Sequence, residues 1–191
     1  MRLFEVSDDI WDFSNIQQEY PSDKTSINQI PRTFKVVDSM GGWREGMINL
    51  DIGGGRDFQQ DGQSVHKFSN ALKNKGVINL VFDPFNRDFS HNMQVVERVK
   101  KEGADSVTVN NVLNVIPEES NRKTVIQQAF QALKPDCYAY FHIYEGNKTG
   151  EGAPSGQGRW QNNLKADHYV SEISSVFSNV NKKGQLIIAK K

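Results

Sequence analysis

The chain has 191 residues, of which 37% are hydrophobic and 24% charged, and its 23 Lys and Arg residues balance 23 Asp and Glu. This length and balance fit a single globular domain and exclude a disordered chain. The net charge of zero also disfavours broad electrostatic binding of nucleic acid, which usually requires a basic face.

Cysteine and histidine usage narrows the chemistry further. The single cysteine, Cys137, excludes an intramolecular disulfide and a cysteine-based zinc cluster. The four histidines show neither HExxH nor HxH spacing, so no metal site is predicted. No segment approaches the roughly 20 apolar residues of a membrane span, and the N-terminus lacks the apolar core of a signal peptide. We therefore expect a cytoplasmic protein without a membrane partner.

Residues 1–46 are weakly patterned. One short helix is predicted from Arg32 to Met40, where Gly41-Gly42 ends it. We expect residues 1–46 to form a flap that lies on the core, residues 47–191, so that the whole chain is one domain.

From residue 47 onward, buried apolar runs alternate with helical spacings of apolar residues. These predict strands at 47–52, 77–82, 106–112 and 137–144, each followed in the chain by a helix, at 64–75, 91–102, 120–133 and 166–177. A polar loop at 146–161 separates the fourth strand from the last of these helices. A hairpin joins 179–181 to 185–189. This alternation predicts an α/β, Rossmann-like, doubly wound and mostly parallel sheet with a C-terminal antiparallel hairpin.

Polar residues follow the first two predicted strands at their carboxyl ends, where open parallel sheets bind ligands. Asp51 precedes Gly53, Gly54 and Gly55, and glycines there permit positive φ and close approach of a ligand to the main chain. The helix that follows would offer N–H groups to a carboxylate. Asp83, at the second strand end, can accept two hydrogen bonds from a ribose diol.

The residues after this turn distinguish between ligands. Phe58 stands where a dinucleotide-binding G-x-G-x-x-G motif requires its third glycine, and Arg56-Asp57 replaces the Gly-Lys-Ser/Thr of a phosphate loop. Asp57 would also repel a pyrophosphate. A methionine-derived ligand, whose ammonium and sulfonium groups are positive, tolerates acidic surroundings better.

Four segments in order resemble motifs of the class I S-adenosylmethionine-dependent methyltransferases: MINLDIGGG (47–55), LVFDPF (80–85), VTVNNVLNVI (107–116) and FQALKPD (130–136). The resemblance covers about residues 46–191 and implies S-adenosylmethionine as the cofactor. It assigns cofactor contacts to Asp51, Gly53, Gly54, Gly55, Asp83, Pro84, Asn110 and Asn111. More narrowly, NNVLNVIP and GRWQNNLKADHYVSEISSVF resemble a bacterial and phage group that includes methyltransferases associated with DNA phosphorothioation.

The sequence departs from the class I pattern in one place. These enzymes usually have another strand and helix before the strand that contains Asn110, and that strand often supplies an acidic contact to the adenine amine. Here Gly103 is followed almost at once by the predicted strand. Either the unit is missing or the sheet is shortened at one edge. The side chain of Asn110 or the backbone near 87–89 would then contact the adenine.

No residue stands out as a catalytic base, but four candidates could line the acceptor site: Asn111, Asn114, Tyr144 and Trp160. Each also has a structural interpretation, since Tyr144 could be an ordinary strand exit and Trp160 could anchor a loop. His142 alternates within an apolar strand and is interpreted as a core histidine.

The absence of two motifs limits the acceptor. The strand end lacks the Pro-Cys pair of cytosine C5 methylation and the D/N/S-P-P-Y/F motif of exocyclic amine methylation. The sequence therefore favours an enzyme that methylates a small molecule or a nucleotide-type substrate by in-line transfer. Two alternatives stay open: a nucleic-acid-modifying or anti-restriction enzyme of a phage or defence system, and a non-catalytic protein that binds S-adenosylmethionine.

Overall fold

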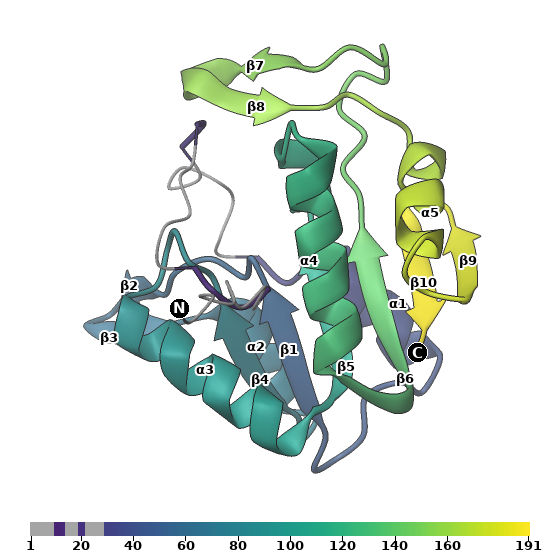
Figure 1. The fold of residues 1–191 in the computed structure, drawn as a ribbon. Coiled ribbons are helices and arrows are strands. Elements are labelled where there is room, and N and C mark those ends of the chain that lie inside the picture. The colour runs from purple at the N-terminus through teal and green to yellow at the C-terminus, as the bar shows by residue number, and fades with distance from the viewer. Residues whose placement is uncertain (1–9, 14–18, 22–28) are drawn as a thin grey trace, which may run out of the picture.

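A computed structural model describes residues 10–13, 19–21 and 29–191. Its centre is a six-stranded sheet in the order β4-β1-β5-β6-β10-β9 (Figure 1). The first four of these strands are parallel, and β10 is antiparallel to both of its neighbours. The bounds are β1 (Ile48–Ile52), β4 (Ile78–Phe82), β5 (Ala104–Asn110), β6 (Leu133–His142), β9 (Asn179–Lys183) and β10 (Leu186–Lys190). The predicted α/β sheet with a C-terminal antiparallel hairpin is confirmed.

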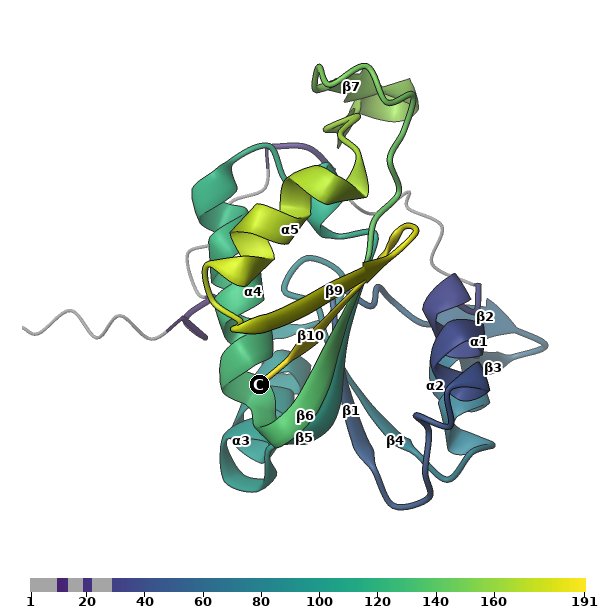
Figure 2. The same ribbon diagram turned by 90° about the vertical axis from the view of Figure 1, so that its right-hand side faces the viewer.

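Helices cover both faces of this sheet (Figure 2). One face carries α1 (Arg32–Ser39) and α2 (Lys67–Lys73), and the other carries α3 (Phe89–Glu102), α4 (Glu119–Ala132) and α5 (Ala166–Ser174). The helix predicted near the N-terminus is therefore present as α1. The flap predicted for residues 1–46 lies partly outside the described residues and stays a prediction.

The two faces of β1 differ in polarity. Leu50 and Ile52 join the apolar core beneath α3, α4 and α5. Asn49 and Asp51 point to the opposite face, although they are only 0% and 2% exposed. Buried polar side chains require hydrogen-bond partners, and the Asn49 amide finds them in Asn79 Oδ1 (2.8 Å) and Thr108 Oγ1 (3.0 Å). Thr108 also donates to Asp51, so the hydrogen-bonded polar side chains on this face of the sheet extend from Asn79 to Asp51.

The sheet is shorter than the class I pattern, as the sequence predicted. The chain passes from β4 through α3 directly into β5, which pairs with β1, and β4 is left at the edge among the described strands. Asp88 caps the first turn of α3 by accepting from the His91 N–H at 2.7 Å. Gly103, with a φ of +69°, ends the helix just before β5.

The predicted helix over Ser64 to Lys75 begins only at Lys67, so the first part of that prediction is wrong. A small hairpin precedes it, made of β2 (Phe58–Gln60) and β3 (Gln63–Val65). Its turn residues, Asp61 and Gly62, have φ values of 52° and 75°. A two-residue turn with both φ values positive is the preferred Asp-Gly hairpin connection. Val65 therefore pairs with Phe58 in a strand and does not face the core from a helix.

The polar loop predicted at 146–161 contains a second hairpin, β7 (Ala153–Ser155) with β8 (Arg159–Gln161), joined by the 3-10 turn Gly156–Gly158. In Figure 1 it projects beyond the upper end of α4, the end at which the parallel strands finish. A short 3-10 helix, η1 (Leu113–Val115), follows β5. Within the described part of the chain, no helix is long and apolar enough to cross a membrane.

Candidate functional site

Three glycines build the turn after β1, and each has its own reason to be glycine. Gly53 has a φ of +70°, and a Cβ on it would lie 2.5 Å from Cγ2 of Val112. A Cβ on Gly54 would collide with the carboxylate of Asp51. Gly55 has a φ of +79°, a region that side chains other than glycine rarely adopt. The turn therefore keeps a close-packed shape, free of its own side chains, at the carboxyl ends of the strands.

Asp51 lies at the base of this turn. Its Oδ1 accepts hydrogen bonds from Thr108 Oγ1 (2.8 Å) and Asn110 Nδ2 (3.3 Å). Thr33 of α1 in turn donates to Asn110 Oδ1 (2.7 Å), which connects the N-terminal helix to the site. Burial raises the pKa of Asp51 to about 7, in spite of the two hydrogen bonds. A positive charge bound nearby would favour the ionised carboxylate.

We expect this raised pKa to make the protein less stable as the pH rises. The unfolded chain ionises Asp51 near 3.8, whereas the folded protein keeps it protonated up to about 7. The stabilisation is therefore complete below about pH 4 and is lost as the pH rises through 7. Relative to Asp51→Asn, the free energy of unfolding of the wild type should fall by roughly 2 kcal/mol from pH 5 to pH 7. Urea denaturation at both pH values measures this, and parallel pH profiles of the two proteins would contradict it.

Asp83 lies at the corresponding end of β4, and both oxygens of its carboxylate accept hydrogen bonds from other groups of the protein. Oδ2 accepts from the Gly55 N–H at 2.8 Å, and Oδ1 accepts from the N–H groups of Phe85 and Asn86 at 3.1 Å each. The Asn86 amide reaches both oxygens, and Pro84 begins this turn half-buried. Asp83 thus joins the glycine turn to the exit of β4. Its contact with a ribose stays a prediction, and a diol would add to these bonds or replace them.

The side chain of Arg87 contacts the glycine turn, whereas the sequence predicted a role only for the backbone near 87–89. Its Nε donates to the Gly55 carbonyl at 2.7 Å, and its Nη2 lies 2.6 Å from Oδ1 of Asp57. Burial raises the pKa of Asp57, but the hydrogen bond and charge of Arg87 outweigh it and hold that pKa below its ordinary value. Because this ion pair balances Asp57, the predicted repulsion of a pyrophosphate loses its force. The glycine spacing still argues against a dinucleotide.

His66 is a second residue that was missed. It caps α2, and its Nδ1 accepts from the Ser69 N–H at 3.2 Å. The proton therefore lies on Nε2, which donates to the Gly54 carbonyl at 2.7 Å. Burial lowers the pKa of His66, which favours this neutral form. Histidine is not a usual capping residue, so the sequence carried little signal for this role.

No family model and no curated protein sequence matches the chain. Among solved structures it is similar to the 1,6-didemethyltoxoflavin-N1-methyltransferase of Burkholderia thailandensis, which has 1,6-didemethyltoxoflavin and S-adenosylhomocysteine bound (TM-score 0.56, 13% identity, 83% of this chain and 76% of that chain). It is also similar to the T. thermophilus 16S rRNA N2 G1207 methyltransferase in complex with AdoMet and guanosine (0.53, 12%, 87% and 45%). A third is a methyltransferase from Methanosarcina mazei (0.50, 16%, 80% and 96%). The fold is that of the S-adenosylmethionine-dependent methyltransferases. The narrower resemblance to the phosphorothioation-associated group stays a prediction.

In this methyltransferase fold the two asparagines at the carboxyl end of β5, Asn110 and Asn111, bond within the protein. Both polar atoms of the Asn110 side chain are engaged, by Asp51 and Thr33, which argues against the predicted adenine contact by this side chain. Asn111 has a φ of 57°, and its Oδ1 lies 2.9 Å from Nδ1 of His142. The other ring nitrogen of His142 is buried without a hydrogen-bond partner in the described part of the chain. Burial lowers the pKa of His142.

The methyltransferase fold brings two of the four acceptor-site candidates together. Asn114 Nδ2 donates to Gln161 Oε1 (3.1 Å), and Gln161 Nε2 donates to the carbonyl of Tyr144 (3.0 Å). Gln161 was not predicted, and it links the loop after β5 to the exit of β6. Trp160 is placed differently, because its Nε1 donates to Asn162 Oδ1 at 2.7 Å. This contact matches the anchoring interpretation of Trp160.

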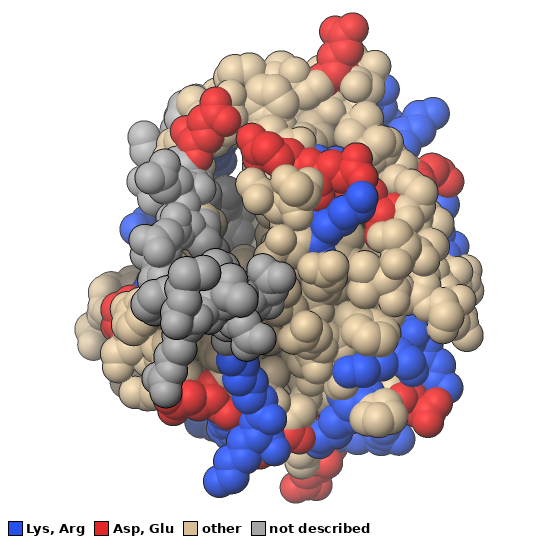
Figure 3. All heavy atoms as spheres, viewed as in Figure 1, with Lys and Arg blue, Asp and Glu red and all other residues tan. Residues whose placement is uncertain are grey.

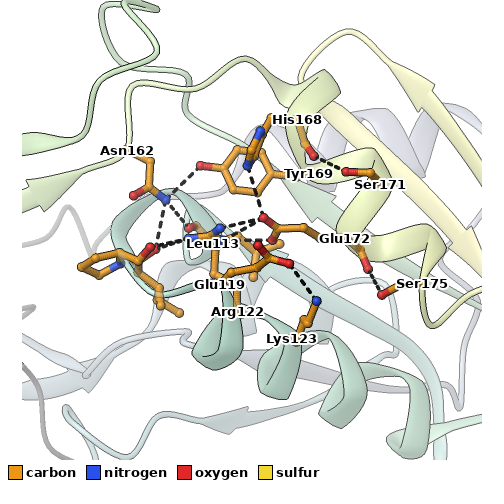
Figure 4. Close-up of polar contacts among 12 residues, drawn as sticks. Leu113, Glu119, Arg122, Lys123, Asn162, His168, Tyr169, Ser171, Glu172 and Ser175 are labelled. Carbon is orange, nitrogen blue, oxygen red and sulfur yellow. Dashed lines mark hydrogen bonds and ion pairs between the residues drawn. The ribbon is translucent and has the colours of Figure 1, made fainter.

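Asn162 is the centre of a polar network that holds the loop after β5 (Figure 4). Its Nδ2 donates to the carbonyls of Leu113 and Ile116 and to the hydroxyl of Tyr169, at 3.0 Å each. Its backbone N–H donates to the carbonyl of Asn114 at 2.8 Å. One side chain at the end of β8 thus fixes both ends of η1.

A buried ion pair completes this network. Arg122 of α4 places Nη2 2.7 Å from Oε1 of Glu172 in α5, and each residue is 5% exposed. The same guanidinium donates from Nη1 to the carbonyls of Ile116 and Pro117. Figure 4 shows how these bonds converge on the loop from two helices. Residues 113–117 are therefore held by Arg122 of α4 and by Asn162 after β8. Two side chains of α5, Tyr169 and Glu172, contact these two residues in turn.

Proposed function

We propose that this protein is an S-adenosylmethionine-dependent methyltransferase that transfers the methyl group in line to a small molecule or nucleotide-type substrate. The observation that supports it most is the glycine turn, which lies between Asp51 and Asp83 at the ends of β1 and β4 and has no side chains of its own from Gly53 to Gly55. A Cβ at Gly53 would meet Val112, and one at Gly54 would meet Asp51 and Val81, so only glycine permits this shape of the turn. Two carboxyl groups beside it suit a ligand with positive ammonium and sulfonium groups.

The cofactor, when bound, supplies a methyl group whose bond to a positive sulfur breaks as the acceptor forms its own bond to the carbon, and the electron pair stays on sulfur. The protein has to hold donor and acceptor in line and exclude water. Gly53 to Gly55 and Asp83 would hold the amino-acid and ribose ends of the donor. The loop 111–117, which reaches the turn through Val112, would face the acceptor.

The distribution of charge supports a small acceptor over a nucleic acid. On the face drawn in Figure 3, acidic side chains gather around the beginning of α4, at the same end as the carboxyl ends of the strands. Glu118 and Glu119 are exposed there. The larger groups of Lys and Arg on that face lie toward the opposite end. A polyphosphate backbone at the site would therefore meet negative charge.

Calorimetric titration tests the cofactor. We expect S-adenosylmethionine and S-adenosylhomocysteine to bind the full chain with micromolar Kd, and NAD to give no binding heat. Asp83→Asn removes the charge at nearly constant volume and should weaken binding at least tenfold. Asp88→Asn is the matched control, because Asp88 is exposed and asparagine also caps helices. Failure of the wild type to bind either ligand would contradict the proposal, and equal affinity of Asp83→Asn would contradict the ribose contact.

A methyl-transfer assay tests the acceptor. The protein is incubated with radiolabelled S-adenosylmethionine and cell extract, which is then divided into small-molecule and nucleic-acid fractions. We expect the label in the small-molecule fraction. Label in nucleic acid would instead support the nucleic-acid-modifying alternative. Tight cofactor binding with no labelled product would support the non-catalytic alternative.

A further inference from the structure

A cavity of about 290 Å³ lies between the exit of β6 and the β7–β8 hairpin, with Tyr144, Asn147, Pro154, Gln161 and Asn163 in its walls. Its volume is near the lower limit of small-molecule sites. We propose that this cavity is the acceptor site and that it takes a neutral, planar heterocycle with an amide or lactam edge. This inference rests on the proposed function, because the acceptor role requires a methyl donor at the glycine turn.

The loop after β5 connects the cavity with the glycine turn. Val112, in the loop after β5, contacts the turn so closely that Gly53 has no room for a Cβ. Two residues later in the same loop, Asn114 donates to Gln161 in the cavity wall. One short loop, fixed by the Asn162 network, therefore contacts both the glycine turn and a residue of the cavity wall. Both also lie at the carboxyl ends of parallel strands, where ligands of such sheets bind.

The cavity walls offer a carboxamide and an aromatic ring to a ligand. Gln161 is 8% exposed, and each polar atom of its carboxamide makes one hydrogen bond within the protein. A carboxamide can make further bonds, so Gln161 can present a donor beside an acceptor, which is complementary to an amide or lactam edge. The 56% exposed ring of Tyr144 adds a flat apolar surface for a planar ligand.

The described walls of the cavity carry no charged side chain. Glu145 follows Tyr144, but its carboxylate accepts from the Ala166 N–H at 2.9 Å and pairs with Lys148 at 2.9 Å. The residues in the walls are all uncharged. An ionised ligand would lose hydration without gaining a counter-charge, which is costly. The cavity therefore favours neutral ligands over their anionic counterparts.

The cavity is also held in shape before any ligand binds. Asn163 Oδ1 accepts from the Asn147 N–H at 3.2 Å, and its Nδ2 donates to the Glu151 carbonyl at 3.0 Å. Asn114 keeps one buried oxygen without a hydrogen-bond partner in the described part of the chain. A preformed wall lowers the entropic cost of binding.

Two matched pairs of probes test the inference: nicotinamide with nicotinate, and uracil with orotate. Each is titrated into the full ¹⁵N-labelled chain saturated with S-adenosylhomocysteine. We expect the neutral probes to shift the amide signals of Gln161 and Asn163 with millimolar Kd, and the anions to bind at least tenfold more weakly. Gln161→Glu places a charge in the wall and should weaken neutral binding at least fivefold, whereas Gln94→Glu on the exposed face of α3 should not.

Tyr144→Ala provides a second variant that removes an exposed ring, with Tyr138→Ala, another exposed tyrosine of the same segment, as its control. We expect only Tyr144→Ala to weaken the neutral probes. Equal binding of neutral and anionic probes, or shifts away from Gln161 and Asn163, would overturn the inference. In a protein that still binds S-adenosylhomocysteine, that result leaves the proposed function standing. If the wild type does not bind S-adenosylhomocysteine, both the proposed function and this inference are overturned.

Discussion

Replacing Gly53 with alanine is expected to weaken S-adenosylhomocysteine binding at least tenfold. The new Cβ would lie 2.5 Å from Cγ2 of Val112, so either the turn or the loop after β5 has to move. Because the proposed ligand lies against the main chain of this turn, a displacement of about 1 Å is enough to disturb several contacts at once. Calorimetric titration of the wild type and the variant measures the change in Kd.

The hairpin turn between β2 and β3 offers a matched control for this substitution. Gly62 has a φ of +75°, close to the +70° of Gly53, but a Cβ on it would meet no atom within 4 Å. Gly62→Ala therefore introduces the same backbone strain, of about 1 kcal/mol, without crowding a neighbour. We expect both variants to lose stability and only Gly53→Ala to lose affinity. Equal losses of affinity would show that strain alone accounts for the effect, and unchanged affinity in both would contradict the placement of the ligand.

Replacing Glu172 with alanine is expected to lower the free energy of unfolding by about 3–5 kcal/mol, because it leaves the buried Arg122 guanidinium without its partner. Arg122 is 5% exposed and donates three hydrogen bonds to the two carboxylate oxygens of Glu172. The double variant Arg122→Met with Glu172→Leu removes both charges and should recover much of the loss. Urea denaturation of the wild type, the single variant and the double variant measures each value.

The neighbouring pair Glu119–Lys123 is the control on the same helix. Figure 4 shows this ion pair beside Arg122. Its separation is a similar 2.7 Å, but its side chains are 57% and 45% exposed. Solvent screens such a pair, so Glu119→Ala should leave the unfolding midpoint unchanged within error. If both single variants unfold at the wild-type midpoint, the Arg122–Glu172 pair does not stabilise the fold.

The sequence predicted the parts of the fold that depend on local periodicity. Apolar runs at 47–52 and 77–82 identified two neighbouring strands of the sheet, and the pairing of these strands brings Asp51 and Asp83 to the same end of the sheet. The short connection at Gly103 also predicted the shortened sheet. The β2–β3 hairpin was within reach as well, because Asp61-Gly62 is a turn signal that the helical spacing after it obscured.

The contacts that complete the site depend on tertiary structure, so sequence patterns could not identify them. Arg87 reaches Gly55 across 32 positions, and Gln161 reaches Asn114 across 47. Neither pair has a motif, since each depends on how β4 and β8 end beside other elements. Asp83 combines both kinds of contact: its bonds from Phe85 and Asn86 are local, whereas its bond from Gly55 spans 28 positions and has no sequence signal.

Because no further described strand pairs with β4, this edge of the sheet is a place where a strand of another chain could add. An uncovered edge strand presents unpaired backbone groups to which another strand can add. At the carboxyl end of β4, however, Nε2 of His91 lies 2.8 Å from the Val81 carbonyl, and Oδ1 of Asn92 accepts from the N–H of Asp83, the residue after the strand, at 2.9 Å. The first turn of α3 thus occupies the backbone groups at the carboxyl end of the edge, next to the glycine turn. Two side chains protect the sheet from intermolecular pairing at the position where a longer relative would place its next strand.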